Sequence, residues 1–249
     1  MAQLLTTRQF KLDKGKFSGV MTAGITLSPA SEAGEVLQRM LASTCSYSGD
    51  CEHGCLKFAG MNQYPTHAVA RAKRTAFWYD AQAEFLAQAV KEYKALVVRS
   101  EKANMLPAGR PNLLSDLPKM AQAIAARVPG MQFYDYTKIP KAWLRVRANY
   151  HLTYSASERS TQADIVGAFE HGINVAVVVS DIKKGEPLPD TYTLHGVKRP
   201  TIDGDADDLR FKDPVGVFVL LRWKGSKARL AAAADSGFAR PTIALRLVS

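Results

Sequence analysis

Runs typical of β-strands alternate with runs typical of helices along most of this 249-residue chain. The helical runs carry apolar residues at the spacing of one helix face, and the runs between them are short and rich in β-branched and aromatic residues. Strands that are joined by crossover helices lie parallel in a sheet, with right-handed connections. The alternation therefore predicts an α/β fold built on a parallel sheet.

The positions of the expected elements follow from this alternation and from the Pro, Gly and polar residues that interrupt it. Strands are expected at 18–27, 131–137, 150–155 and 173–179, with another at 95–99 or 110–116 and one or two more within 201–211 and 215–223. Helices are expected at 66 to about 93, 117 to about 128 and about 141–147, and from a capping box of Thr161 and Asp164 as far as Gly172. Ser115 or Asp116 is expected to cap the second of these helices.

The number of strand-and-helix units limits the architecture. About six units favour a partial or open (βα)6-type barrel over the closed eight-unit form, with a doubly wound parallel sheet as the alternative. A single α/β domain is expected over 1–249, with the cysteine loop at 44–56 and a more irregular, β-rich part from about 183. Both architectures bind ligands at the carboxyl edge of the sheet, so functional residues are expected where strands end.

The balance of charges indicates the kind of partner. Thirty-three Lys and Arg against 23 Asp and Glu give a formal net charge of +10, which favours a nucleic acid or nucleotide partner. No run approaches the roughly 20 apolar residues of a membrane span, and the first residues lack the apolar core of a signal peptide. We therefore expect a cytoplasmic protein without membrane association, in a reducing compartment that keeps thiols free. The oligomeric state is not determined by the sequence.

All three cysteines of the chain, Cys45, Cys51 and Cys55, fall in one short segment with the spacing C-x5-C-x3-C. Sulfur ligands of zinc or of an iron–sulfur cluster must converge, whereas cysteines used only for packing are scattered. The alternatives are a disulfide with a spare thiol, or three unrelated buried cysteines. Their clustering favours a metal site. For zinc, His53 or His67 would be the fourth ligand.

Polar side chains follow each predicted strand. Ordinary helix capping explains Asp116 and Ser160 or Thr161 by default. Capping explains Asp135 and Lys138 less well, and these two are either functional or an internal ion pair. The candidates at the second, third and fourth strand exits are Asn112, Ser115, Asp116, Asp135, Lys138, Ser155, Ser157 and Glu158.

The segment 203–210 places four carboxylates within six positions, and carboxylate oxygens are ligands for hard cations. The segment departs from the EF-hand pattern, since Asp208 stands where the glycine is expected and Pro214 where a bidentate Glu is expected. A solvated turn is the preferred interpretation.

Several motifs together resemble an uncharacterised family of bacteriophage proteins, described as a domain of unknown function. The resemblance covers most of the chain and is carried by 27–30, the cysteine loop, 110–116, 133–138, 150–158 and 202–210. More distantly, a cysteine loop after the first strand of about six βα units resembles the radical S-adenosylmethionine enzymes.

That distant resemblance implies a cofactor site. In those enzymes three cysteines bind three irons of a [4Fe–4S] cluster, and the amino and carboxylate groups of S-adenosylmethionine occupy the fourth iron. Cys45, Cys51 and Cys55 would be the three metal ligands here. The usual spacing is C-x3-C-x2-C, and Gly54 replaces the aromatic residue that commonly precedes the last cysteine.

The resemblance also implies roles for residues at the strand exits. By strand order, Asn112, Ser115 and Asp116 would bind the amino group of the methionine moiety. Ser155, Ser157 and Glu158 would contact the ribose or carboxylate. Asp135 and Lys138 remain the candidate catalytic residues.

These observations lead to one expected function and two alternatives. The expected protein is a [4Fe–4S], radical S-adenosylmethionine-like phage enzyme of the host cytoplasm, which acts on nucleic acid or nucleotides and requires an electron donor. The first alternative is a zinc-stabilised, basic nucleic-acid-binding protein without catalysis. The second is a metal-free phage interaction protein.

Overall fold

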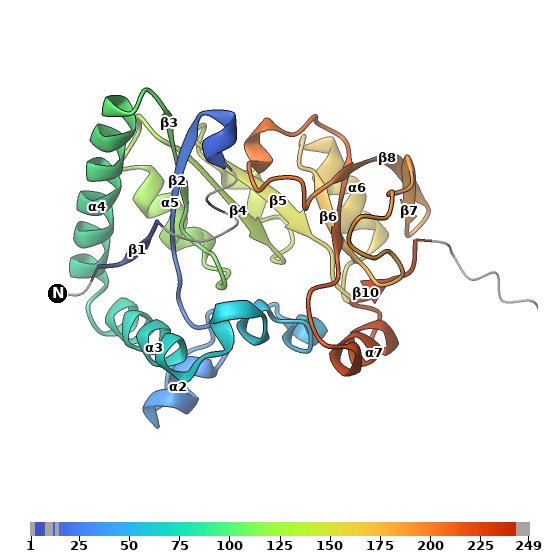
Figure 1. The fold of residues 1–249 in the computed structure, drawn as a ribbon, viewed down its shortest axis with the longest axis horizontal. Coiled ribbons are helices and arrows are strands. Elements are labelled where there is room, and N and C mark those ends of the chain that lie inside the picture. Colours follow the sequence, from blue (N-terminus) through green and yellow to red (C-terminus); the bar gives the residue numbers. More distant parts are fainter. Residues whose placement is uncertain (1–2, 8–11, 13–14, 243–249) are drawn as a thin grey trace, which may run out of the picture.

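The computed structural model describes residues 3–7, 12 and 15–242, and in this part of the chain helices surround a ten-stranded sheet (Figure 1). The strands are β1 (Leu5–Thr6), β2 (Val20–Ile25), β3 (Leu106–Arg110), β4 (Gln132–Thr137), β5 (Tyr150–Ser155), β6 (Val175–Val179), β7 (Thr191–Leu194), β8 (Val197–Asp203), β9 (Phe218–Arg222) and β10 (Ala239–Arg240). Their order is β1-β2-β3-β4-β5-β6-β9-β8-β7, and β10 pairs with β6 outside this order.

The sheet is mostly parallel and open. Neighbours from β2 to β8 pair in parallel, whereas β1 and β7 pair antiparallel with β2 and β8 at the two edges. Because the edge strands do not pair with each other, the sheet does not close into a barrel. The expected partial or open α/β architecture is confirmed.

Helices pack on the sheet and gather at the carboxyl ends of its strands. Figure 1 shows α4 and α5 beside the first strands, α6 beside the later ones, and α2, α3 and α7 near the carboxyl edge. No helix within the described ranges is long and apolar enough to cross a bilayer. The α-helices are α2 (Glu32–Leu37), α3 (Pro65–Asp80), α4 (Gln82–Lys102), α5 (Pro118–Ala125), α6 (Gln162–Glu170) and α7 (Lys227–Asp235), and the 3-10 helices are η1 (Gly15–Ser18), η2 (Gly49–Glu52), η3 (Leu56–Phe58), η4 (Gly60–Gln63), η5 (Ala142–Arg145) and η6 (Arg210–Lys212).

Two apolar clusters hold the helices to the outer face of the sheet. Under α4 and α5, Tyr93 meets Phe133 of β4 edge to face, with ring centroids 5.0 Å apart. Under α6, Ile165 belongs to a cluster with Val177 and Phe218. Burying a large apolar side chain contributes roughly 1.5–3 kcal/mol, so these clusters are the main source of stability.

The opposite, inner face of the sheet is partly filled by the segment 204–213, which follows β8. Side chains alternate between the two faces of a strand, so Tyr134 points inward while its neighbour Phe133 points outward. Leu209 and Phe211 pack against Tyr134 and the start of β2 at Val20. The segment therefore lies inside the curve of the sheet.

Two expected elements were wrong, and packing explains both. The helix expected over 66–93 is broken at Ala81 (φ −149°, ψ 66°), which lets Phe77 and Trp78 pack against Phe85. The helix then continues through 95–99, so that run is not a strand. The strand is instead β3, of which only Arg110 lies within 110–116.

Other expectations are confirmed. β2, β4, β5, β6, β9, α5 and α6 lie where the sequence indicates, and Thr161 and Asp164 form the expected capping box. Of the expected strand region 201–211, only 201–203 is strand, at the end of β8. Neither Ser115 nor Asp116 caps α5, whose N-cap is Leu117 without a side-chain bond. The short helix near 141–147 is the 3-10 helix η5. The elements β1, α2, β7, α7 and β10 were not predicted. The apolar residues of α7 are mostly alanines, which give weak periodicity.

The acidic segment 203–210 is not the solvated turn that was expected. Its carboxylates form ion pairs: Asp203 with Arg222, Asp205 with Lys224, Asp207 with Arg210, and Asp208 with Arg110. Asp208 is buried. The charges that would otherwise attract a cation are already neutralised by neighbouring basic side chains.

Candidate functional site

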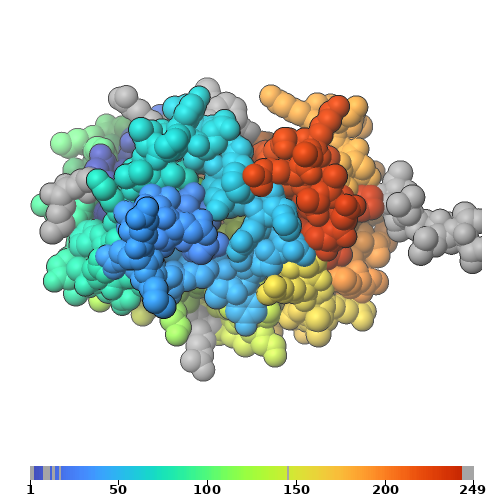
Figure 2. All heavy atoms as spheres, turned by 90° about the horizontal axis from the view of Figure 1, so that it is seen from below, coloured from blue at the N-terminus to red at the C-terminus, as the bar shows by residue number. Residues whose placement is uncertain are grey.

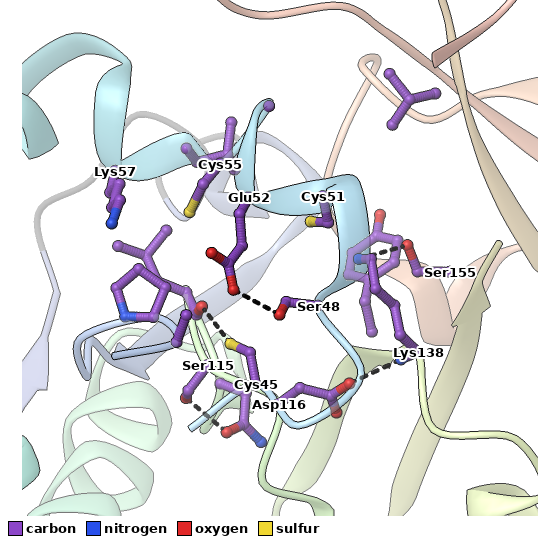
Figure 3. Close-up of a pocket in the computed structure, with 18 of the residues that line it drawn as sticks. Cys45, Ser48, Cys51, Glu52, Cys55, Lys57, Ser115, Asp116, Lys138 and Ser155 are labelled. Atoms are coloured by element: carbon purple, nitrogen blue, oxygen red, sulfur yellow. Dashed lines mark hydrogen bonds between the residues drawn. The ribbon is translucent and has the colours of Figure 1, made fainter. Parts of the chain in front are cut away.

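A cavity of about 190 Å³ lies at the carboxyl edge of the sheet, and all three cysteines line it (Figure 3). We call it the cysteine cavity. Its other walls come from the residues that follow β3 and β4 and from the ends of β5, β6 and β9. Seen from the carboxyl edge, the cysteine segment lies across the sheet beside α7 (Figure 2). The three cysteines therefore lie at the edge where functional residues were expected.

The start of the cysteine segment is anchored by hydrogen bonds to neighbouring loops. The Thr44 hydroxyl donates to the carbonyl of Ser28, and the Thr44 carbonyl accepts from the backbone N–H of Asp116 at 2.9 Å. Cys45 Sγ lies 3.6 Å from the carbonyl of Leu114. These bonds fix the first thiol against the loop that follows β3.

Glu158, which follows β5, holds the middle of the segment. Its Oε1 accepts from the backbone N–H of Asp50 at 3.2 Å. Gly49 has a positive φ of +49°, and a Cβ at this position would lie 2.0 Å from the same oxygen. Only glycine lets the segment approach Glu158 this closely while it adopts the left-handed conformation.

The thiols of the cavity are partly buried. Burial raises the pKa of Cys55 to about 11, and the nearby Cys51 and Cys45 raise it further. Burial also raises the pKa of Cys45. Both thiols are therefore protonated at neutral pH in the metal-free chain, and binding a metal would release their protons.

Lys138 supplies a positive charge beside the thiols. Its Nζ donates to Ser155 Oγ at 3.1 Å. Burial lowers the pKa of this ammonium, but its interactions with Cys51 and Asp116 outweigh that effect, so its pKa is raised. Lys138 therefore stays charged at the wall of the cavity.

The loop after β3 presents polar groups to the cavity from a rigid base. Asn112 Oδ1 accepts from Ser115 Oγ at 2.8 Å and from the backbone N–H of Leu117 at 3.1 Å. Asp116 Oδ2 accepts from the backbone N–H of Lys138 at 2.7 Å. Asp116 Oδ1 is buried without a hydrogen-bond partner among the described residues. It is thus an acceptor that a bound ligand could satisfy.

Five of the eight predicted polar site residues line the cysteine cavity. They are Asn112, Ser115, Asp116, Lys138 and Ser155. The other three, Asp135, Ser157 and Glu158, are not among its lining residues. Ser157 is buried, and its hydroxyl accepts from the backbone N–H of Arg159 at 3.3 Å.

Asp135 lies on the outer, helix-covered face of β4, where it is completely buried. It accepts from the backbone N–H and the side-chain amide of Asn112, each at 2.9 Å, and from the Tyr150 hydroxyl at 3.1 Å. Burial raises its pKa to about 7, against the opposing effects of Arg110 and these hydrogen bonds. Asp135 thus positions Asn112 from beneath the cavity.

Sequence reasoning missed Trp223 and Glu52, which also line the cavity. A Cβ added at Gly54 would lie 2.5 Å from the Trp223 ring, so this indole occupies the space beside the third cysteine. Glu52 accepts from Ser48 Oγ at 2.7 Å and lies among the three cysteines in Figure 3. Gly54 was the available signal for Trp223, since a small residue there leaves room for a ring from another element.

The side chains do not form a ready site for one metal ion. Within the described part of the chain, no group of three or more His, Cys, Asp or Glu residues could hold a single ion. His53 and His67, the expected fourth zinc ligands, do not line the cysteine cavity. His53 Nε2 instead lies 3.7 Å from Asp50 Oδ1.

Comparison with known families identifies the chain. The family model described as gene product 88 matches residues 3–242. The chain belongs to the gene product 88 family. Membership in this family of phage gene products agrees with the expected bacteriophage relationship. The match to gene product 88 spans the cysteine segment and every strand of the sheet. No curated protein and no solved structure matches the chain.

Proposed function

We propose that this protein is a [4Fe–4S]-dependent, radical S-adenosylmethionine-like enzyme that acts on nucleic acid or nucleotides. The observation that carries the proposal is the cysteine cavity itself, where Cys45, Cys51 and Cys55 meet at the carboxyl edge of an open parallel sheet. Ligands of α/β folds bind at this edge. The radical S-adenosylmethionine enzymes, which the sequence motifs led us to expect as distant relatives, also have a three-cysteine loop after the first strand of a partial barrel.

The arrangement of the thiols suits a cluster better than a single ion. In a [4Fe–4S] cluster each cysteine binds a different iron, so the three sulfurs gather around the cluster and lie farther apart than the ligands of one ion. A Cys3His zinc site requires four ligands around one ion, and neither His53 nor His67 lines the cavity. The cluster is therefore preferred over zinc.

The residues of the cavity have separate tasks in this proposal. When bound, the cluster and S-adenosylmethionine supply one-electron reduction of a sulfonium. Lys138 stabilises negative charge on the ligating thiolates. Asp116 would accept from the amino group of S-adenosylmethionine through its unpartnered Oδ1, beside Asn112 and Ser115. The cysteine segment shields the cavity from water.

The net charge of +10 supports a polyanionic or nucleotide substrate. It does so by attracting phosphate groups to the protein from solution, which raises their local concentration at its surface.

The decisive experiment is iron and sulfide analysis of protein purified and reconstituted without oxygen, with electron paramagnetic resonance after reduction. About four irons and four sulfides per chain are expected for a [4Fe–4S] cluster, together with a spectrum that changes when S-adenosylmethionine is added. The C45S/C51S/C55S variant is the matched control, which should keep its circular dichroism spectrum and bind no iron. Stoichiometric zinc without iron or sulfide after reconstitution would overturn the proposal.

A further inference from the structure

A second cavity, of about 700 Å³, adjoins the cysteine cavity. We call it the side chamber. It lies between the residues that follow Cys55 and the segments that follow β6, β8 and β9. The two cavities share wall residues, among them Leu56, Arg110 and Trp223. The volume of the side chamber falls in the range of about 300–1,000 Å³ that is typical of small-molecule sites.

Two buried donors on the shared wall lack a hydrogen-bond partner among the described residues. One is Trp223 Nε1, and the other is Arg110 Nε. Arg110 is only 5% exposed, and its Nη1 donates to Asp208 at 2.6 Å. An unsatisfied buried donor is unfavourable, so two of them on one wall indicate a ligand that brings acceptors.

The indole of Trp223 is held in a fixed position. A Cβ added at Gly54 would lie 2.5 Å from one edge of its ring, and one added at Gly225 would lie 3.0 Å from it. The ring is therefore packed between two glycines, with its N–H buried at the wall of both cavities. A rigid aromatic ring with a free donor suits a planar heterocycle, because every nucleobase has a face for stacking and acceptors on its edge.

The charges of the side chamber favour an anion. Its lining holds five cationic side chains, namely Arg110, Lys183, Lys184, Arg222 and Lys224, against the carboxylates of Asp205, Asp207 and Asp208. Arg110, Arg222 and Lys224 are paired with carboxylates. Within the described residues, no ion pair involves the ammonium groups of Lys183 and Lys184, which lie exposed on the segment after β6. These two lysines provide the excess positive charge.

We propose that the side chamber binds a nucleoside 5′-monophosphate, with its base against Trp223 and its phosphate at Lys183 and Lys184. This inference names the substrate class of the proposed enzyme and so rests on the proposed function. The donors of Trp223 and Arg110 recognise acceptors on the base or sugar. The adjoining cysteine cavity keeps the bound nucleotide beside the place where the chemistry occurs.

Isothermal titration calorimetry tests the inference without a loaded cluster. The probes are AMP, GMP, CMP and UMP, their parent nucleosides and inorganic phosphate, each titrated into the metal-free chain and into the C45S/C51S/C55S variant. We expect at least one monophosphate to bind both proteins equally, at least about tenfold more tightly than its nucleoside, because the phosphate adds charged contacts. Added salt should weaken binding of the monophosphate and leave binding of the nucleoside unchanged.

Variants of the lining assign the contacts. The K183A/K184A variant should bind the monophosphate at least about fivefold more weakly than wild type and bind the nucleoside with unchanged affinity. The matched control is K94A/K119A, which removes two exposed lysines from α4 and α5 and should have no effect. W223F keeps an aromatic ring but loses the indole N–H. It should lower the affinity for the nucleotide and for the nucleoside alike. Circular dichroism on each variant verifies folding.

The experiments distinguish failure of the nucleotide site from failure of the proposed function. Absence of binding by every monophosphate at millimolar concentration, or equal binding by wild type and K183A/K184A, overturns the inference even if iron loads normally. Binding of an oligonucleotide without any mononucleotide also overturns it. Nucleotide binding by a chain that takes up no iron would overturn the proposed function alone.

Discussion

Arg110 and Asp208 form a buried ion pair that joins the end of β3 to the segment after β8, with 2.6 Å between Nη1 and Oδ2. Four strands lie between β3 and β8 in the sheet, so this pair spans the inside of its curve. The Arg110 guanidinium also stacks over the Tyr136 ring at 4.9 Å. The ion pair thus links β3 to the segment after β8 at the wall of the side chamber, and Arg110 lines both cavities.

Replacing one member of this ion pair should lower the free energy of unfolding more than replacing both members. R110M removes the guanidinium that pairs with the buried Asp208 carboxylate, and a loss of about 3–5 kcal/mol in the free energy of unfolding is expected. R110M/D208L removes both charges and should lose much less. Urea denaturation of the two variants and of D208L measures the coupling. Equal and additive losses would show that the pair contributes nothing as a unit.

Substitution of Gly49 should affect stability and iron binding more than substitution of Gly60. Both have positive φ, +49° and +55°, but only at Gly49 would a Cβ collide with a neighbour, namely Glu158. G60A should cost about 1–2 kcal/mol for the left-handed conformation and still bind iron. G49A should cost more and lose part of its iron, because Glu158 or the segment must shift and the hydrogen bond from the Asp50 N–H to Glu158 is then weakened. Thermal unfolding and iron analysis compare the two, and normal iron binding by G49A would contradict the expectation.

Metal loading should improve as pH rises. The pKa of Cys55 is about 11 and that of Cys45 is also raised, so both thiols must lose a proton to bind metal. Below these pKa values each thiol contributes up to about a tenfold gain in apparent affinity per pH unit. Iron uptake at pH 7 and pH 9, under a competing chelator whose own pH dependence is corrected for, measures this. Uptake that falls over this range would count against thiolate ligation.

Asp135 should make the protein less stable as pH rises from about 4 to 7. Its pKa is about 7 in the folded chain and near 3.8 when exposed, so the folded state holds the extra proton between these values. Its contribution is present at low pH and is lost as the carboxyl ionises, with an upper limit of about 4 kcal/mol. The free energy of unfolding of D135N, compared with wild type across this range, should lack that slope. An identical slope in both proteins would assign the titration elsewhere.

Lys138 should tune the proposed cluster more than it stabilises the fold. K138M removes the positive charge beside Cys51, so reduction should become harder and the midpoint potential more negative. K141M removes an exposed lysine of the same loop and is the control. Redox titration followed by electron paramagnetic resonance compares the two. A midpoint that K138M leaves unchanged would argue that Lys138 is remote from the cluster.

The parts of the fold that were predictable are those whose sequence pattern agrees with their packing. β6 reads as a buried strand because Val175–Val179 is continuously apolar, and α6 begins at a capping box. β3 was missed because Pro107 and Gly109 are poor strand formers. Gly109 is nevertheless required, since a Cβ there would lie 2.6 Å from the Phe133 ring. That contact is tertiary and leaves no local signal.

The same distinction applies to the site. Cysteines after the first strand and polar groups after later strands were correctly expected at one edge, because parallel strands end together. Which side chains face the cavity depends on the alternation of each strand. Asp135 points to the helices and Lys138 to the cysteines. An error of one residue in the predicted alternation at the end of β4 would exchange these two directions. Trp223 reaches the cavity from a strand far along the chain, so only the fold reveals it.

The cysteine cavity is bounded by Cys45 near one end of the sequence and by Phe238 near the other. A nascent chain on the ribosome therefore presents its thiols long before the walls that surround them exist. Insertion of the proposed cluster would have to wait until almost the whole polypeptide has been synthesised and has left the exit tunnel. During that interval the cysteines are accessible to oxidation, so the rate of folding after synthesis would set how much of the protein could acquire the proposed cluster.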